Sequence, residues 1–346
     1  MSSENSRVLV TGVNGYIGAQ VANAFLEAGY SVIGTSRKAA KAQKLKDFFR
    51  KYGEDKFEVA EVADLEDEGA FDELVKRVDV IAHVASPTFQ QSDDPLRDIV
   101  GKAVNGTLSV LRSATAHGKN VKHIVVTSSV ASIINSPNPP EYSHTEKDWN
   151  ETAFPTVQRS IENGQPLPHM LYYAASKVEA ERALWKYYAE VKPHYKLTTI
   201  LPSFVLGPIL PPPGSSSELN DTTALMAIDF YTGKNQDPTF SFGSNNFVSV
   251  LDVAKAHLKA AEGGDKTDGQ RYILSARGFS FQEMVDIFRK AYPDRKDIIA
   301  EGQPGLYPPS SKTIDGSKAA RDLDIVYAGF ESTLLETIDS VKNAVQ

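Results

Sequence analysis

Short apolar runs alternate along the chain with longer stretches in which apolar residues recur at helical spacing. After the first run, Ile17, Val21 and Phe25 recur every four residues, and Gly29 follows them. The apolar runs predict strands at residues 7–11, 31–35, 57–63, 79–84, 122–127, 196–201 and 271–275. The amphipathic stretches predict helices near residues 15–28, 39–51, 67–77, 95–117 and 170–191.

This alternation predicts an α/β fold of the Rossmann type, a doubly wound parallel sheet with helices on both faces. After residue 202 the rhythm ends, and the proline-rich run 208–213 reads as a loop. We expect residues 247–252 and the strand 271–275 to return to the main sheet. The expected domains are a dinucleotide-binding domain of residues 1–202 plus 247–277 and a smaller, irregular C-terminal substrate lobe of residues 203–246 plus 278–346.

Composition narrows the function classes. The 346 residues carry a net charge of −7, which argues against a nucleic-acid or acidic-membrane partner. The chain contains no cysteine, which excludes disulfides and thiolate chemistry, and its histidines show no metal-ligand spacing. Residues 1–7 are polar and no apolar run approaches the length of a membrane span, so we expect a cytoplasmic protein without a metal.

The run TGVNGYIG places three glycines directly between the first strand and the first helix. A tight strand-to-helix turn needs positive φ, and a pyrophosphate needs close approach to the backbone. The free N–H groups at the helix start then face the anion. We predict that a dinucleotide binds Gly12, Gly15, Tyr16, Ile17 and Gly18.

The end of the second strand indicates which dinucleotide. NAD enzymes of this architecture usually place a carboxylate there, whereas this chain has Ser36, Arg37 and Lys38, followed by Lys41 and Lys44. Arg37 and Lys41 suit a 2′-phosphate, so the predicted cofactor is NADP(H). For the other two lysines a solvated basic face is an equal alternative.

The ends of the next strands offer further contacts. Asp64, beside Leu65, is expected to bind the adenine amino group, although a simple helix cap explains it nearly as well. Small residues let a nicotinamide ribose approach the fourth strand's end, at Val84, Ala85 and Ser86. The fifth strand ends in Thr127, Ser128 and Ser129, whose hydroxyls can point into the site. Thr127 is expected to contact the cofactor, and a serine hydroxyl is suited to donate to a substrate carbonyl oxygen.

Tyr173 and Lys177 lie four residues apart and share a helix face. A neighbouring ammonium favours the phenolate, and this makes a tyrosine a useful proton donor. The same spacing occurs at Tyr52, Tyr188 and Tyr292, but only Tyr173 opens a helix after the serine-bearing strand.

Together these segments resemble an extended short-chain dehydrogenase/reductase, most of all the branch of dihydroflavonol reductases and fungal NADPH-dependent carbonyl, methylglyoxal and aldehyde reductases. The resemblance runs through TGVNGYIG, GTSRKAAK, HVASP, VNGT, VVTSS and YAASK and covers nearly the whole chain. It implies reduction of a ketone or aldehyde, in a monomer or homodimer.

The resemblance also implies residue roles. Ser129 matches the catalytic serine, Tyr173 the proton donor, Lys177 the ribose-binding lysine, and Asn105 an asparagine that supports the lysine through water. The stretch beside the carboxamide corresponds to Pro202, Ser203, Phe204 and Val205. An apolar substrate pocket is expected from Phe89, Val130, Met170, Phe204 and Phe240, although ordinary core positions explain these residues as well.

Two alternatives remain at this stage. A sugar-nucleotide epimerase or dehydratase shares the scaffold, but such dehydratases carry an Asp-Glu pair after the catalytic hydroxyl, where this chain has Val130, Ala131 and Ser132. A non-catalytic NADP-sensing regulator typically loses the tyrosine that is retained here.

Overall fold

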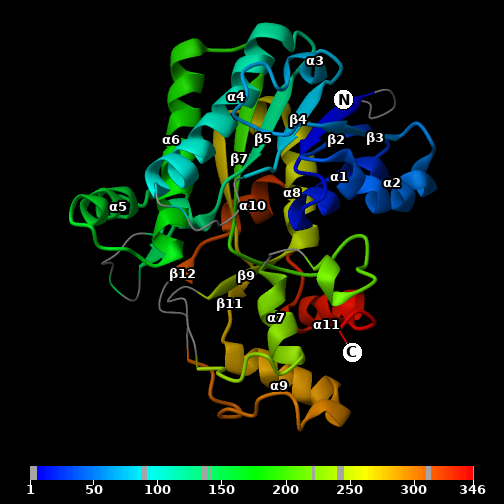
Figure 1. Cartoon of the computed structure of the whole chain (residues 1–346), viewed down its shortest axis with the longest axis vertical. Coiled ribbons are helices and arrows are strands. Elements are labelled where there is room, and N and C mark those ends of the chain that lie inside the picture. The colour runs from blue at the N-terminus through cyan, green and yellow to red at the C-terminus, as the bar shows by residue number, and fades with distance from the viewer. Residues whose placement is uncertain are drawn as a thin grey trace.

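The computed structural model describes residues 6–86, 92, 94–134, 139, 142–219, 223–239, 245–308 and 313–345. A parallel sheet of seven strands lies at its centre, in the spatial order β10-β7-β5-β4-β1-β2-β3 (Figure 1). The strands are β1 (Arg7–Thr11), β2 (Ser31–Ser36), β3 (Phe57–Glu61), β4 (Val80–His83), β5 (His123–Thr127), β7 (Lys196–Pro202) and β10 (Gln270–Leu274). The Rossmann-type prediction is thereby confirmed.

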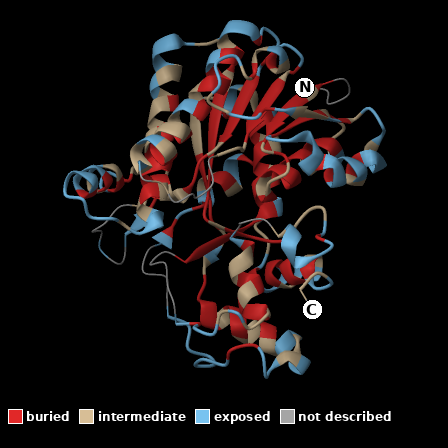
Figure 2. Ribbon diagram, in the orientation of Figure 1, coloured by how far each residue is buried: buried red, intermediate tan, exposed pale blue. Residues whose placement is uncertain are grey.

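The strands of this sheet are buried on both faces, as Figure 2 shows. In β1, Val8 and Val10 face one apolar core while Leu9 faces another, and all three are fully buried. A strand covered on both sides has no solvent face for polar residues. This is why the strands appear in the sequence as continuous apolar runs.

Helices cover the two faces of the sheet. One core includes residues of α1 and α8, and the other includes residues of α4 and α6. The helices are α1 (Tyr16–Glu27), α2 (Gln43–Phe49), α3 (Asp72–Val75), α4 (Lys102–His117), α5 (Ala153–Glu162), α6 (His169–Val191), α7 (Ala224–Tyr231), α8 (Val250–Glu262), α9 (Phe281–Ala291), α10 (Ser317–Asp322) and α11 (Phe330–Val341).

Two predicted helices are shorter than the pattern indicated. The stretch 39–51 is divided into a 3₁₀ turn (Ala39–Ala42), α2 and a second 3₁₀ turn. The stretch 67–77 contains only α3, because Gly69 takes a φ of +77° just before it. Apolar spacing identifies the face that packs, but it does not determine where the hydrogen-bond ladder is interrupted.

The expected return of residues 247–252 to the main sheet is wrong. The strand β9 (Asn246–Ser249) pairs instead with β8 (Phe204–Leu206) and β11 (Arg277–Gly278) in a separate three-stranded sheet. Phe247 enters the core of the smaller lobe while Val248 enters a core of the main sheet. The adjacent residues Phe247 and Val248 are both buried because β9 lies between two apolar cores. The chain rejoins the main sheet with α8 and then β10.

The smaller lobe has its own apolar core, which includes residues of α7, α9 and α11 and of the strands β8 and β9. It lies below the carboxyl ends of the main sheet in the view of Figure 1. A two-stranded pairing of β6 (Ser143–His144) with β12 (Thr313–Ile314) adds a link between distant segments. The domain boundaries themselves stay a prediction.

The topology indicates where a ligand binds. From β1 the chain moves outward to β2 and β3, and it then returns to β4 on the other side of β1. Ligands of doubly wound sheets bind at such a switch point, beyond the carboxyl ends of the strands. In the described part of the chain, no helix has the length and apolar character needed to cross a bilayer.

Candidate active site

The turn between β1 and α1 is tight at two glycines. Gly12 has a φ of +67°, and a Cβ on it would lie 3.0 Å from the Cα of Ala85. A Cβ on Gly18 would lie 2.2 Å from the carbonyl oxygen of Gly12. Larger residues would therefore fill this cradle or displace its backbone. The cradle fits the pyrophosphate of a dinucleotide.

The start of α1 faces the same turn. The helical ladder begins with the N–H of Ala19 donating to the carbonyl of Gly15 at 3.0 Å, so the N–H groups of residues 16–18 have no partner within the ladder. The phenol of Tyr16 donates to the carbonyl of Gly207 at 2.8 Å. The side chain of Tyr16 is therefore engaged within the protein, and only its backbone N–H can contact a ligand at the turn. The helix start suits an anion.

Beyond β2, the side chains of Arg37 and Lys41 are exposed on the turn that leads into α2. Between them, the N–H of Ala39 donates to Oε2 of Glu61 at 2.9 Å. Lys44 differs from the other two, because its ammonium lies 2.6 Å from the carboxylate of Glu218. The structure thus favours Arg37 and Lys41 over Lys44 as 2′-phosphate ligands.

Asp64 caps the turn after β3, where its Oδ1 accepts the N–H of Glu66 at 2.9 Å. This contact agrees with the alternative of a structural cap, and binding of adenine by Asp64 stays a prediction. Leu65, next to it, lines a small cavity that also contacts Ser86 and Lys177.

The end of β4 is fixed by Thr11. Its Oγ1 accepts the N–H groups of Val84 and Ala85, each at 3.0 Å, and lies 2.9 Å from Nδ1 of His83. Burial, together with the nearby charge of Lys177, lowers the pKa of His83 to about 3. His83 is therefore a neutral, packed residue, and Thr11 holds the backbone N–H groups of the two residues that follow it.

The two serines after β5 differ in their contacts. The hydroxyl of Ser128 donates a buried hydrogen bond to Oε2 of Glu181 at 2.7 Å. Ser129 is the N-cap of a 3₁₀ turn (Val130–Ser132) and accepts the N–H of Ala131 on its Oγ at 3.1 Å. Because an accepting hydroxyl keeps its own proton, Ser129 retains a donor for a substrate.

Tyr173 and Lys177 lie on α6, which packs against the turn of residues 128–132, called the serine turn below. The ammonium of Lys177 lies 5.6 Å from the centre of the Tyr173 ring and donates to Oγ of Ser86 at 3.1 Å. The lysine is buried while the tyrosine is half-buried. The fold therefore brings the end of β4 together with Lys177 of α6.

The other tyrosines at this spacing lie elsewhere. The phenol of Tyr52 donates to Oδ1 of Asn23, and the phenol of Tyr188 donates to Oδ1 of Asp268 at 2.7 Å. Tyr292 packs against Tyr231 in the smaller lobe. The choice of Tyr173 among the four agrees with the arrangement of the elements.

The segment from Pro202 to Val205 joins β7 to β8. The Oγ of Ser203 is buried without a hydrogen-bond partner among the described residues. An amide such as a nicotinamide carboxamide would satisfy it. The hydroxyl of Thr127 contacts Nε2 of His257 at 2.7 Å, and contact of Thr127 with the cofactor stays a prediction.

Asn105 lies on the outer face of α4. Its side chain is exposed, and its amide donates to Oε1 of Glu66 at 3.0 Å. The packed face of α4 carries Ala103, Gly106 and Thr107. Among the described residues, Lys177 donates to Ser86 and no direct hydrogen bond joins it to Asn105. Support of Lys177 by Asn105 through water stays a prediction.

The expected substrate pocket stays a prediction. Val130 and Phe204 are half-buried, after Ser129 and in β8, whereas Met170 is 49% exposed. The rings of Phe204 and Phe279 are 5.6 Å apart, so Phe204 belongs at least partly to the core of the smaller lobe. Phe89 and Phe240 lie outside the described residues.

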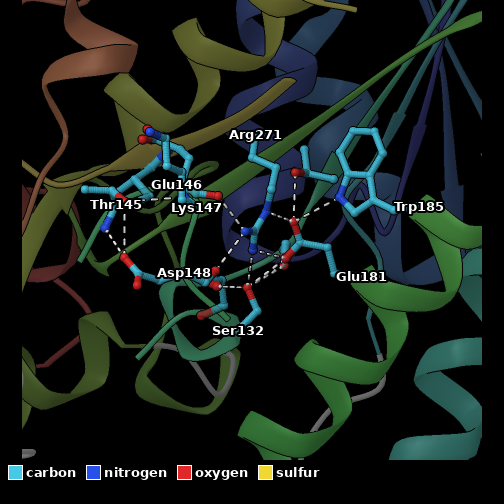
Figure 3. A network of polar contacts seen from close by, with 12 residues as sticks. Ser132, Thr145, Glu146, Lys147, Asp148, Glu181, Trp185 and Arg271 are labelled. Atoms are coloured by element: carbon cyan, nitrogen blue, oxygen red, sulfur yellow. Dashed lines mark hydrogen bonds and ion pairs between the residues drawn. The ribbon is translucent and has the colours of Figure 1, made fainter. Parts of the chain in front are cut away.

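Two buried residues beside the site were missed by the sequence analysis. Glu181 and Arg271 form an ion pair of 2.8 Å at the serine turn (Figure 3). Glu181 follows Lys177 by four residues, so its place on the same helix face was a usable signal. Arg271 comes from β10, and no local pattern connects it with α6.

Comparison with known proteins places these features in a family. The model of the NAD dependent epimerase/dehydratase family matches residues 8–274. An uncharacterized oxidoreductase of Schizosaccharomyces pombe is 35% identical, over 95% of this chain and 95% of its own. Aldehyde reductase 2 of Sporidiobolus salmonicolor is 32% identical, over 87% of this chain and 86% of its own.

Among solved structures, the yeast methylglyoxal/isovaleraldehyde reductase Gre2 complexed with NADPH superposes with a TM-score of 0.85. It is 28% identical, and the match covers 97% of this chain and 98% of that one. The likeness therefore extends over both the main sheet and the smaller lobe.

Proposed function

The chain belongs to the NAD dependent epimerase/dehydratase family, and from this premise we propose that it reduces a ketone or aldehyde to an alcohol with NADPH. One observation carries the proposal: α6, with Tyr173 and Lys177, packs against the turn that follows Ser129, and Lys177 contacts Ser86 beside the glycine turn. The relatives named as NADPH-dependent and aldehyde reductases support the same activity.

The residues present fit NADP(H). The glycine cradle and the start of α1 would hold the pyrophosphate, and Arg37 and Lys41 would hold the 2′-phosphate. Lys177, beside Ser86, is placed to bind ribose hydroxyls, and the unpartnered Ser203 Oγ suits the carboxamide. When bound, NADPH supplies the hydride for the carbonyl carbon.

The chain's own residues act on the carbonyl oxygen. Ser129 donates a hydrogen bond from its free O–H, which stabilises negative charge on that oxygen. Tyr173 gives up its phenolic proton to the same oxygen and completes the alcohol. The ammonium of Lys177 stabilises the resulting phenolate.

The epimerase alternative has less support. After Ser129 the chain forms a 3₁₀ turn whose Ser132 hydroxyl is directed at Glu181, and this turn carries no acidic side chain. Reduction of small carbonyl compounds agrees with the named relatives. The cytoplasmic location and a monomeric or homodimeric state stay predictions.

Replacement of Tyr173 by Phe tests the function. Loss of the proton donor is expected to lower kcat by about 10²–10⁴-fold, whereas NADPH still binds because Lys177 and the glycine turn are unchanged. The measurement is NADPH oxidation over a panel of aldehydes and ketones, with NADPH binding followed by fluorescence. Unchanged turnover of every accepted substrate by Tyr173→Phe would disprove the mechanism.

A further inference from the structure

A buried ion pair lies next to the serine turn of residues 128–132 (Figure 3). The Glu181 side chain is 1% exposed and that of Arg271 is 10% exposed, and Nε of the arginine lies 2.8 Å from Oε1 of the glutamate. Glu181 lies one helical turn beyond Lys177 and two turns beyond Tyr173 on α6. Glu181 is therefore part of the helix that carries Tyr173 and Lys177, and Arg271 reaches it from β10.

The carboxylate of Glu181 holds both ends of the serine turn. Its Oε2 accepts from Ser128 and from Ser132, each at 2.7 Å. Ser129, the proposed donor to substrate, lies between these two anchors. The other oxygen, Oε1, accepts from Thr199 on β7 at 2.9 Å. Helix, turn and strand thus meet at one carboxylate.

Arg271 connects a further segment to this point. Its Nη1 donates to the carbonyl oxygens of Glu146 at 2.7 Å and Asp148 at 2.9 Å. Its guanidinium lies over the ring of Trp149, 3.9 Å from the ring centre. The N–H of Asn150 donates to the carbonyl of Ser132 at 2.8 Å. The loop of residues 145–150 is therefore fixed to the same turn.

The carboxylate remains ionised in this buried place. Burial by itself would raise the pKa of Glu181, but the Arg271 charge and the hydroxyls of Ser128 and Ser132 outweigh it and hold that pKa below its usual range. A buried charge with all its hydrogen bonds satisfied gives a rigid, specific geometry, and loss of one partner disrupts it.

We propose that Glu181, held by Arg271, is a positioning residue that sets the place of Ser129 relative to Tyr173 and Lys177. The inference rests on the proposed function, because it matters only if Ser129 and Tyr173 act on one carbonyl oxygen. Two donors must reach the same atom, so a small shift of the serine turn reduces the rate of the chemical step. Glu181 itself contacts neither substrate nor cofactor in this role.

The test is Glu181→Gln, which keeps the side-chain shape but replaces one accepting oxygen by an amide donor. We expect kcat for NADPH-dependent reduction of an accepted aldehyde to fall at least tenfold, while the Kd for NADPH changes less than twofold. The matched control is Glu179→Gln on the same helix, whose carboxylate lies 3.9 Å from Arg182. The control is expected to keep both values.

A second variant tests the same role if Glu181→Gln does not fold. Ser128→Ala combined with Ser132→Ala leaves the ion pair in place and removes both anchors, and the same selective loss of kcat is expected. A folded Glu181→Gln protein with wild-type kcat, or equal losses of kcat and NADPH affinity, would overturn the positioning role alone. If the wild-type protein binds NADPH but reduces no compound of the panel, the proposed function fails and the inference fails with it.

Discussion

Ser128 and Ser129 are adjacent residues of one type, yet the structure gives their hydroxyls different partners. Successive side chains of extended backbone point to opposite sides, and Ser129 has a φ of −161°. Ser128 consequently reaches the buried Glu181, whereas the Oγ of Ser129 accepts the N–H of Ala131. The catalytic role of Ser129, which the family resemblance implied, stays a prediction that this geometry supports.

The cation at position 37 is expected to select the cofactor. Replacement of Arg37 by Ala removes a charged hydrogen bond to the 2′-phosphate and should raise the KM for NADPH by about 10- to 100-fold. The KM for NADH should change little, since NADH has no such phosphate. Steady-state kinetics with the two cofactors measures the difference.

Lys44 provides the control for this prediction. Its ammonium is already paired with Glu218 at 2.6 Å, so Lys44→Ala should leave the preference for NADPH nearly unchanged. Equal effects of the Arg37 and Lys44 replacements would show that a diffuse basic surface, and not a defined ligand, binds the phosphate.

At the scale of elements, the glycine turn and α1 act as one unit. Gly18 is in the first turn of α1, yet the space that its Cβ would need is taken by the carbonyl of Gly12 in the preceding turn. The helix can approach the turn this closely only without a side chain at that position. This contact fixes the end of the helix that faces the pyrophosphate.

Replacement of Gly18 by Ala should therefore weaken NADPH binding and lower the free energy of unfolding by about 1–3 kcal/mol. Chemical denaturation and fluorescence titration with NADPH measure the two effects. Gly15→Ala is the matched control for stability, because its Cβ would lie 3.2 Å from the same oxygen and its φ is −85°. The prediction is contradicted if the two variants lose the same free energy of unfolding.

At the scale of the whole molecule, three buried histidines make stability depend on pH. Burial and the charge of Lys177 lower the pKa of His83 to about 3. For His123, burial is the main cause that lowers its pKa to about 4, and the same holds for His257. Each is neutral in the folded protein but takes up a proton below about pH 6.5 when the chain unfolds.

Since the unfolded state binds more protons, stability falls as the pH decreases through 6.5. The loss is expected to be about 2 kcal/mol for each histidine between pH 7 and pH 5. Urea denaturation at the two pH values measures the change. His257→Gln should reduce the dependence, whereas His117→Gln, at a position 42% exposed, should not. A free energy of unfolding that is equal at both pH values would refute this.

The sequence by itself determined where the strands of the main sheet lie and that a glycine-rich turn joins the first strand to the first helix. Apolar runs and helical spacing report directly on which backbone is buried, so the seven strands of the main sheet and the helix that carries Tyr173 were predictable. Contacts between distant segments were not. The orientation of Asn105 depends on how α4 packs, and the pairing of β9 with β8 depends on a second core that no local pattern describes.

The tertiary structure alone decided how polar side chains meet across the fold. Glu181 and Arg271 are separated by 90 residues, and only the neighbouring positions of α6 and β10 bring them together. Periodicity is a property of one segment, whereas a buried ion pair depends on the approach of two segments and on the satisfaction of every donor. For that reason Tyr173 and Lys177 could be proposed from their spacing and their place after the serine-bearing strand, whereas the contacts that hold the turn of Ser129 could not be predicted.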